Sequence, residues 1–154
     1  MLDNIEFKIA QSEYFLEEMK GNEARPNEFL FNLSAFLGSV KSIMYFLEKQ
    51  VKNTKNKKNK EWYYCGGRCE FYKNDDLRII LTMRDKDVHE QVDLKDTKKD
   101  VIIHLPVVGS FGQVITNDNW FFKGRPDKPL LELCENFLKK VKAVFEKIKN
   151  LEIS

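Results

Sequence analysis

Cysteine is scarce in this sequence, and its cysteines do not form the pattern of a disulfide framework. Only Cys65, Cys69 and Cys134 occur among 154 residues. Secreted domains that depend on disulfides carry denser and usually even-numbered sets. The N-terminal residues, which include Asp3 and Glu6, also show no basic segment followed by an apolar run, the pattern of a secretory signal. We therefore expect a cytoplasmic protein.

The sequence also lacks a strong charge of either sign and a long apolar run. No apolar stretch approaches the length needed to span a bilayer, so we expect no membrane partner. The net charge is only +2, so any affinity for an anionic polymer must come from local clusters of lysine and arginine. A content of 42% hydrophobic and 32% charged residues describes a globular chain. Its length predicts a single domain over residues 1–154.

Apolar residues recur at helical spacing in the first third of the chain. They predict a helix over about 2–20, ended by Gly21 and Asn22, and a second helix from Pro26 to about Val51. The second helix is apolar over a wide arc, so we expect it to contact several neighbours at the centre of a bundle.

Residues 52–60 contain no apolar side chain and predict a solvated connection. A plain loop is one interpretation. The other is a phosphate-attracting segment, because five lysines fall within these nine residues and create a local positive field. The candidate nucleic-acid contacts are Lys55, Lys57, Lys58 and Lys60.

The next segment combines aromatic residues and two cysteines at helical spacing. Trp62, Cys65, Cys69 and Tyr72 recur on one stripe, which predicts a helix with this stripe packed inside. Gly66-Gly67 predicts a kink or a close helix contact. The two cysteines could also bind metal or act as a redox pair, but the usual zinc spacing and a second ligand pair are missing. We expect no metal and no other cofactor.

The second half of the chain predicts two more helices with a short β segment between them. Asp75 or Asp76 would cap a helix that runs to about His89, and the last helix follows Pro129. Between them, β-branched and aromatic runs predict a small β-hairpin over about 101–123, with Trp120 or Phe121 packed against the helices. The expected fold is mainly α, a four- to five-helix up-and-down bundle with a β-hairpin inserted before the C-terminal helix.

A candidate site lies at the end of the helix that begins near residue 75. The segment Arg84-Asp85-Lys86-Asp87-Val88-His89 contains one of only two histidines. Histidine moves protons near neutral pH, and a guanidinium binds phosphate through a planar fork. The other histidine, His104, falls in the β segment, has no partner nearby in the sequence and is expected to be structural or exposed.

Helical phase assigns different roles to the three residues of this candidate site. Asp85 and His89 are four residues apart and share a face, so Asp85 can orient the imidazole. Arg84 and His89 are separated by about 140° around an ideal helix and by about 7.5 Å along it. Cleavage of a phosphodiester by its own 2′-hydroxyl requires a base and an acid, whereas one chain supplies one histidine here. Two protomers meeting at this helix would supply both.

Taken with Leu33-Ser34-Ala35-Phe36-Leu37 in the long second helix, this segment resembles the HEPN superfamily. Similar members carry Arg-x4-6-His with a polar residue directly after the arginine, as Asp85 is here. The resemblance covers roughly residues 1–93 and the last helix. It implies a helical bundle that forms a homodimer and, in active members, a metal-independent RNA endonuclease that leaves a 2′,3′-cyclic phosphate. Such enzymes are often toxins with an antitoxin protein as partner, or components of defence systems.

The sequence departs from this family pattern at two places. The hairpin is inserted where simpler members have a short connection, and position 91 is Gln where the subgroup regulated by nucleotidylation has Tyr. Two other functions remain open. The chain could be a noncatalytic HEPN-like nucleotide-binding or protein-interaction module, with the polar residues at a dimer interface. Alternatively, its wide apolar second helix could dock a different protein.

Overall fold

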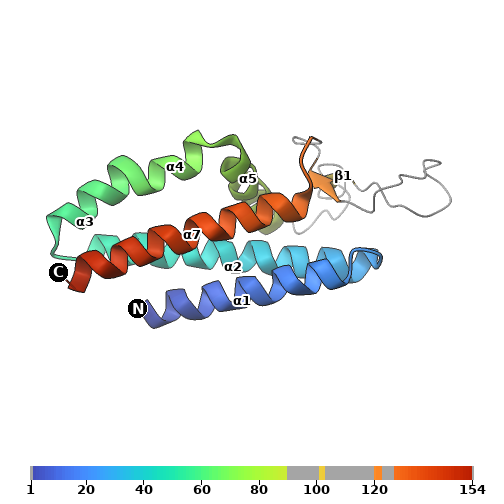
Figure 1. The fold of residues 1–154 in the computed structure, drawn as a ribbon, viewed down its shortest axis with the longest axis horizontal. Coiled ribbons are helices and arrows are strands. Elements are labelled where there is room, and N and C mark those ends of the chain that lie inside the picture. The colour runs from blue at the N-terminus through green and yellow to red at the C-terminus, as the bar shows by residue number, and fades with distance from the viewer. Residues whose placement is uncertain (1, 90–100, 103–119, 123–126, 154) are drawn as a thin grey trace.

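The structure is a computed structural model that describes residues 2–89, 101–102, 120–122 and 127–153. Side chains at 85–89, 101–102, 121–122 and 151–153 fall outside this description. The described part is mainly helical, as the sequence predicts. Long helices run side by side in a bundle, and a shorter helical layer covers them (Figure 1).

The first two helices form a helical hairpin that confirms the sequence prediction. Helix α1 spans Leu2–Gly21 and α2 spans Pro26–Asn53, and they pack along each other. The backbone N–H of Asn22 donates to the carbonyl of Met19, which closes the turn after α1. Pro26 begins α2. Its fixed φ suits a first helical turn, and an N–H at this position would have no partner within the helix. The turn therefore sets the two helices antiparallel.

Helix α2 is the central core helix. It buries a wide set of side chains, namely Phe29, Leu33, Phe36, Leu37, Ser39, Val40, Ile43, Met44, Leu47 and Val51. By length and composition alone it is apolar enough to cross a membrane, so the expectation that no segment reaches that length was wrong. Of its most apolar window, 44% is buried inside the bundle, which is the property of a core helix as well.

The expected loop at 52–60 is wrong, because helical structure resumes after three residues. Helix α3 spans Lys57–Trp62 and continues into a π-helix, η1, at Tyr63–Gly67 and then α4 at Arg68–Lys73. Asn56 begins α3, where its Oδ1 accepts hydrogen bonds from the N–H groups of Lys58 at 3.0 Å and Asn59 at 3.4 Å. This cap satisfies two backbone N–H groups at the start of α3. A search for apolar periodicity does not reveal such a cap.

The buried face of the α3–η1–α4 segment differs from the predicted stripe. The buried residues are Asn59, Tyr63, Gly67 and Phe71, whereas Cys65 and Tyr72 are exposed. A π turn adds a residue to one helical turn and so shifts the phase of everything after it. At Gly67 the close neighbour is in the same helical segment, since a Cβ there would lie 2.9 Å from the Trp62 ring.

Helices α5 and α7 complete the described bundle. Helix α5 spans Asp75–His89, and its cap is Asn74 instead of the predicted Asp75 or Asp76. The Asn74 Oδ1 accepts from the N–H of Asp76 at 2.9 Å. Helix α7 spans Leu130–Ile153, and α5 packs against α2, α4 and α7. Figure 1 shows α7 crossing the bundle between the α1 side and the α3–α4 side.

The β-hairpin expected over 101–123 is not supported. Most of that range, including His104, lies outside the described residues. What is described is an antiparallel pairing of β1, Val101–Ile102, with β2, Phe121–Phe122. The packing predicted for Trp120 is confirmed, because it is 1% exposed and stacks on Phe29 with ring centroids 4.2 Å apart. Its Nε1 donates to the Glu23 carbonyl at 3.0 Å, which anchors it to the α1–α2 turn.

Candidate functional site

Helix α5 holds the candidate catalytic segment at its C-terminal end. Its apolar side chains Leu77, Ile80, Leu81 and Met83 are buried in the core. These contacts fix the helix against α2 and α7 up to the residue before Arg84. Arg84 itself is half-buried. The arginine therefore directly follows the buried core residues of α5.

Asp85 and His89 both belong to α5, whose helical backbone extends to His89. Along this helical backbone, their four-residue separation corresponds to about one turn. Their side chains lie outside the described residues. The structure thus places both residues on helical backbone, and the shared face, the proton-transfer role and the phosphate-binding role remain predictions.

The candidate lysines lie at the other end of the bundle from α5. Lys55, Lys57 and Lys58 are exposed and Lys60 is half-buried, around the start of α3. Helix α3 contacts the end of α7 that bears Lys147, whose Nζ lies 4.5 Å from the Trp62 ring centroid. In Figure 1, α3 lies near the C-terminus of α7 and α5 near its N-terminal end. The structure therefore does not bring the two predicted sets together.

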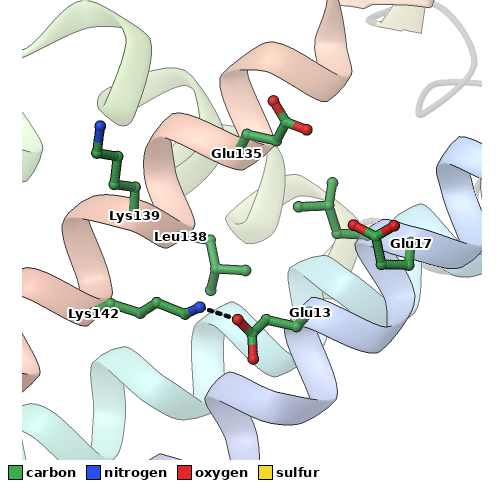
Figure 2. Close-up of a pocket in the computed structure, with 7 residues that line it drawn as sticks. Glu13, Glu17, Glu135, Leu138, Lys139 and Lys142 are labelled. Carbon is green, nitrogen blue, oxygen red and sulfur yellow. Dashed lines mark hydrogen bonds and ion pairs between the residues drawn. The ribbon is translucent and has the colours of Figure 1, made fainter.

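A hollow of about 400 Å³ lies between α1 and α7 (Figure 2). Its charged groups pair across the two helices: Lys142 bonds Glu13, and Lys20 contacts Glu135 at 2.8 Å. Hydrogen bonds to Glu135 and Glu17 raise the pKa of Lys20, which keeps it charged. Ion pairs connect the two helices around this hollow, so its features are those of a helix–helix contact.

A second hollow, of about 410 Å³, was missed by the sequence analysis. It is lined by Tyr64, Arg68, Cys69, Tyr72 and Lys73 on η1 and α4. The predicted helical stripe included Cys69 and Tyr72 but assigned them to the interior. The π turn is the reason, because helical phase counted at 3.6 residues per turn fails across it. We call this feature the tyrosine hollow.

Among the described residues, the cysteines form neither a metal centre nor a disulfide. There, no group of three His, Cys, Asp or Glu side chains is placed to hold a metal ion. Cys69 donates its Sγ–H to the Tyr64 carbonyl at 3.1 Å, which ties its side chain to the backbone of η1. Cys134 is buried, and this burial raises the pKa of its thiol. Its environment is that of a core residue.

No protein-family model, curated protein or solved structure matches the chain. The chemistry of its own residues is therefore what supports a function.

Proposed function

We propose that the chain is a metal-independent, HEPN-like RNA endonuclease whose composite active site forms between two copies. One observation carries the proposal: Arg84, Asp85 and His89 occupy the final turns of α5 in a mainly helical protein. A proton-transfer group, its orienting carboxylate and a phosphate-binding cation thereby share the end of one packed helix. This combination suits phosphodiester cleavage.

Each of the three residues has a distinct proposed role. His89 acts as general base for the 2′-hydroxyl or as general acid for the departing 5′-oxygen. Asp85, one turn earlier, accepts a hydrogen bond from the imidazole and favours its charged form. Arg84 holds the scissile phosphate and stabilises the charge that develops on it. The attack forms a 2′,3′-cyclic phosphate and releases a 5′-hydroxyl, so no metal-bound water is needed.

The homodimer follows from the count of acid–base groups. One α5 supplies one histidine, and the reaction uses both an acid and a base. In the proposed dimer two α5 ends face one groove, within a cytoplasmic protein whose helices form an up-and-down bundle. A role as a toxin or defence component, held inactive by an antitoxin protein, fits an enzyme of this kind.

The test is cleavage of a labelled single-stranded RNA by the purified full chain in buffer containing EDTA. We expect cyclic-phosphate ends and a loss of about 100-fold or more in rate for His89→Ala. Arg84→Lys should also be slow, because an ammonium lacks the planar fork. His104→Ala removes the other histidine and is the matched control. Size measurement by light scattering should give twice the chain mass.

Two outcomes contradict the proposal. One is an absence of RNA cleavage by a folded, dimeric parent chain. The other is a His89→Ala variant that cuts as fast as the parent. If His89→Ala instead weakens the dimer and no RNA is ever cut, the polar residues form a noncatalytic interface, which is the alternative module.

A further inference from the structure

The tyrosine hollow combines aromatic and cationic side chains on one surface of the η1–α4 segment. The Cζ atom of Arg68 lies 5.8 Å from the Tyr72 ring centroid, a cation–π contact. Tyr72 is 45% exposed, so its ring is accessible to a ligand. Tyr64 is half-buried and makes an edge contact with the buried Tyr63, with ring centroids 5.4 Å apart. Tyr64 is thus held by its contact with the core, and Tyr72 is exposed to solvent.

The π turn is what puts these groups together. In η1 the extra residue moves Tyr64 relative to α4, while Trp62 covers Gly66 and Gly67 from the preceding turn. The Cys69 thiol bonds the Tyr64 carbonyl, which fixes the backbone where η1 passes into α4. Single π turns inside helices occur frequently at functional sites. Here the turn shapes the wall of an accessible hollow.

The electrostatics of the hollow favour an anion. Burial opposes the charge on Arg68, but the hydrogen bond to Tyr72 and the nearby Glu48 carboxylate outweigh it and raise the pKa of Arg68. Glu48 is itself paired with Lys52 at 2.9 Å. Lys73 lines the hollow and also a neighbouring one of about 340 Å³ that includes the Lys140–Glu70 ion pair. Cations therefore outnumber carboxylates along this surface.

We propose that the tyrosine hollow binds single-stranded RNA, with a base against Tyr72 and the adjoining phosphates on Arg68 and Lys73. Aromatic stacking next to a cationic track is the common solution for single strands, because every base has a π face and every linkage a charge. A paired helix would bury its bases and could not stack on Tyr72.

This inference rests on the proposed function, because it takes RNA as the ligand. It adds a place where the substrate is held on η1 and α4, which carry no candidate catalytic residue. Holding the strand at a second point would increase the residence of the substrate without taking part in proton transfer.

Binding can be measured without cleavage in the His89→Ala chain, using a fluorescein-labelled uridine 12-mer and anisotropy. We expect Tyr72→Ala to weaken binding at least about 5-fold, the lower end of one stacked base. Lys73→Ala should lower the slope of log affinity against log salt by about 0.7, the value for one phosphate contact on a single strand. Tyr72→Phe keeps the stacking ring and should bind nearly as well as its parent.

The matched control is Tyr45→Ala. Tyr45 is an exposed tyrosine on α2 at 59% exposure, with the Lys49 Nζ 5.9 Å from its ring centroid, so it has the same chemistry outside the tyrosine hollow. Equal weakening by Tyr45→Ala and Tyr72→Ala would overturn the inference, as would the absence of binding. If the chain cuts RNA but Tyr72→Ala binds RNA normally, the inference about the hollow fails and the proposed nuclease activity stands. If the hollow binds RNA and nothing is cut, the proposed nuclease activity fails and the hollow stands.

Discussion

At the residue scale, the two neighbouring glycines of η1 have opposite surroundings. A Cβ on Gly67 would lie 2.9 Å from Cη2 and 3.1 Å from Cζ3 of Trp62. The Trp62 ring is partly buried against the core, and Lys147 lies over it. A Cβ on Gly66 would lie 3.8 Å from its nearest neighbour, an ordinary contact. The requirement for glycine is therefore steric and confined to Gly67.

This contrast gives a paired prediction. Gly67→Ala should lower the free energy of unfolding by about 1–3 kcal/mol, because the indole is too well packed to move aside freely. Gly66→Ala should leave it unchanged or raise it by up to about 1 kcal/mol, because alanine favours helical backbone. Urea unfolding followed by circular dichroism measures both. Equal losses for the two variants would contradict the close contact and point to a general intolerance of side chains in η1.

At the element scale, α3 shows where sequence patterns stop being sufficient. Periodicity predicted α1, α2, α5 and α7, because each has an apolar stripe long enough to determine its packed face. It failed at α3, whose sequence Lys-Lys-Asn-Lys-Glu-Trp contains a single apolar residue. The helix is held by a local cap and by its continuation into η1, and neither of these produces a hydrophobic period.

The candidate site on α5 and the tyrosine hollow also differ in how well the sequence predicts them. The helix bearing Arg84 was predictable, because buried leucine and isoleucine precede it at helical spacing. The tyrosine hollow was not, because a single added residue in η1 rotates Tyr72 from the expected interior to the surface. A period of 3.6 contains no information on where such a residue is inserted.

Asn59 supplies the prediction for this element. It is 0% exposed, and neither its Nδ2 nor its Oδ1 has a hydrogen-bond partner in the described part of the chain. An unsatisfied buried amide costs about 1–3 kcal/mol. Asn59→Leu, which keeps a branched shape, should therefore raise the free energy of unfolding by about 1–3 kcal/mol.

The exposed Asn53 at the end of α2 provides the control for this change. Asn53→Leu should shift the free energy of unfolding by no more than about 0.5 kcal/mol. The urea midpoint should rise for Asn59→Leu alone, with an unchanged slope. A lower midpoint for Asn59→Leu would mean that the amide is satisfied in solution.

At the scale of the whole molecule, α7 joins the two sides of the bundle through its core face. Ion pairs such as Lys149–Glu6 and Lys142–Glu13 connect it to α1, but pairs this exposed contribute about 0–1 kcal/mol each. Its buried face, which includes Cys134, Phe137 and Val141, is 0% exposed at each of these positions and supplies the larger part of the stabilisation. The two sides should therefore unfold together.

Cys134 makes this cooperativity measurable, because its thiol is buried in the α7 core face while Cys65 is exposed. Burial raises the pKa of Cys134, and only a thiolate that reaches solvent reacts with a disulfide reagent. At pH 8 in excess Ellman's reagent, Cys65 should react at the rate of a free thiol. Cys134 should react at least about 1,000-fold more slowly, at a rate set by global unfolding.

In urea above the unfolding midpoint all three thiols should react together, and Cys134→Ala should remove the slowest phase. A Cys134 rate close to that of Cys65 in native buffer would show that α7 separates from the bundle without unfolding the rest, and the two sides would then be independent units.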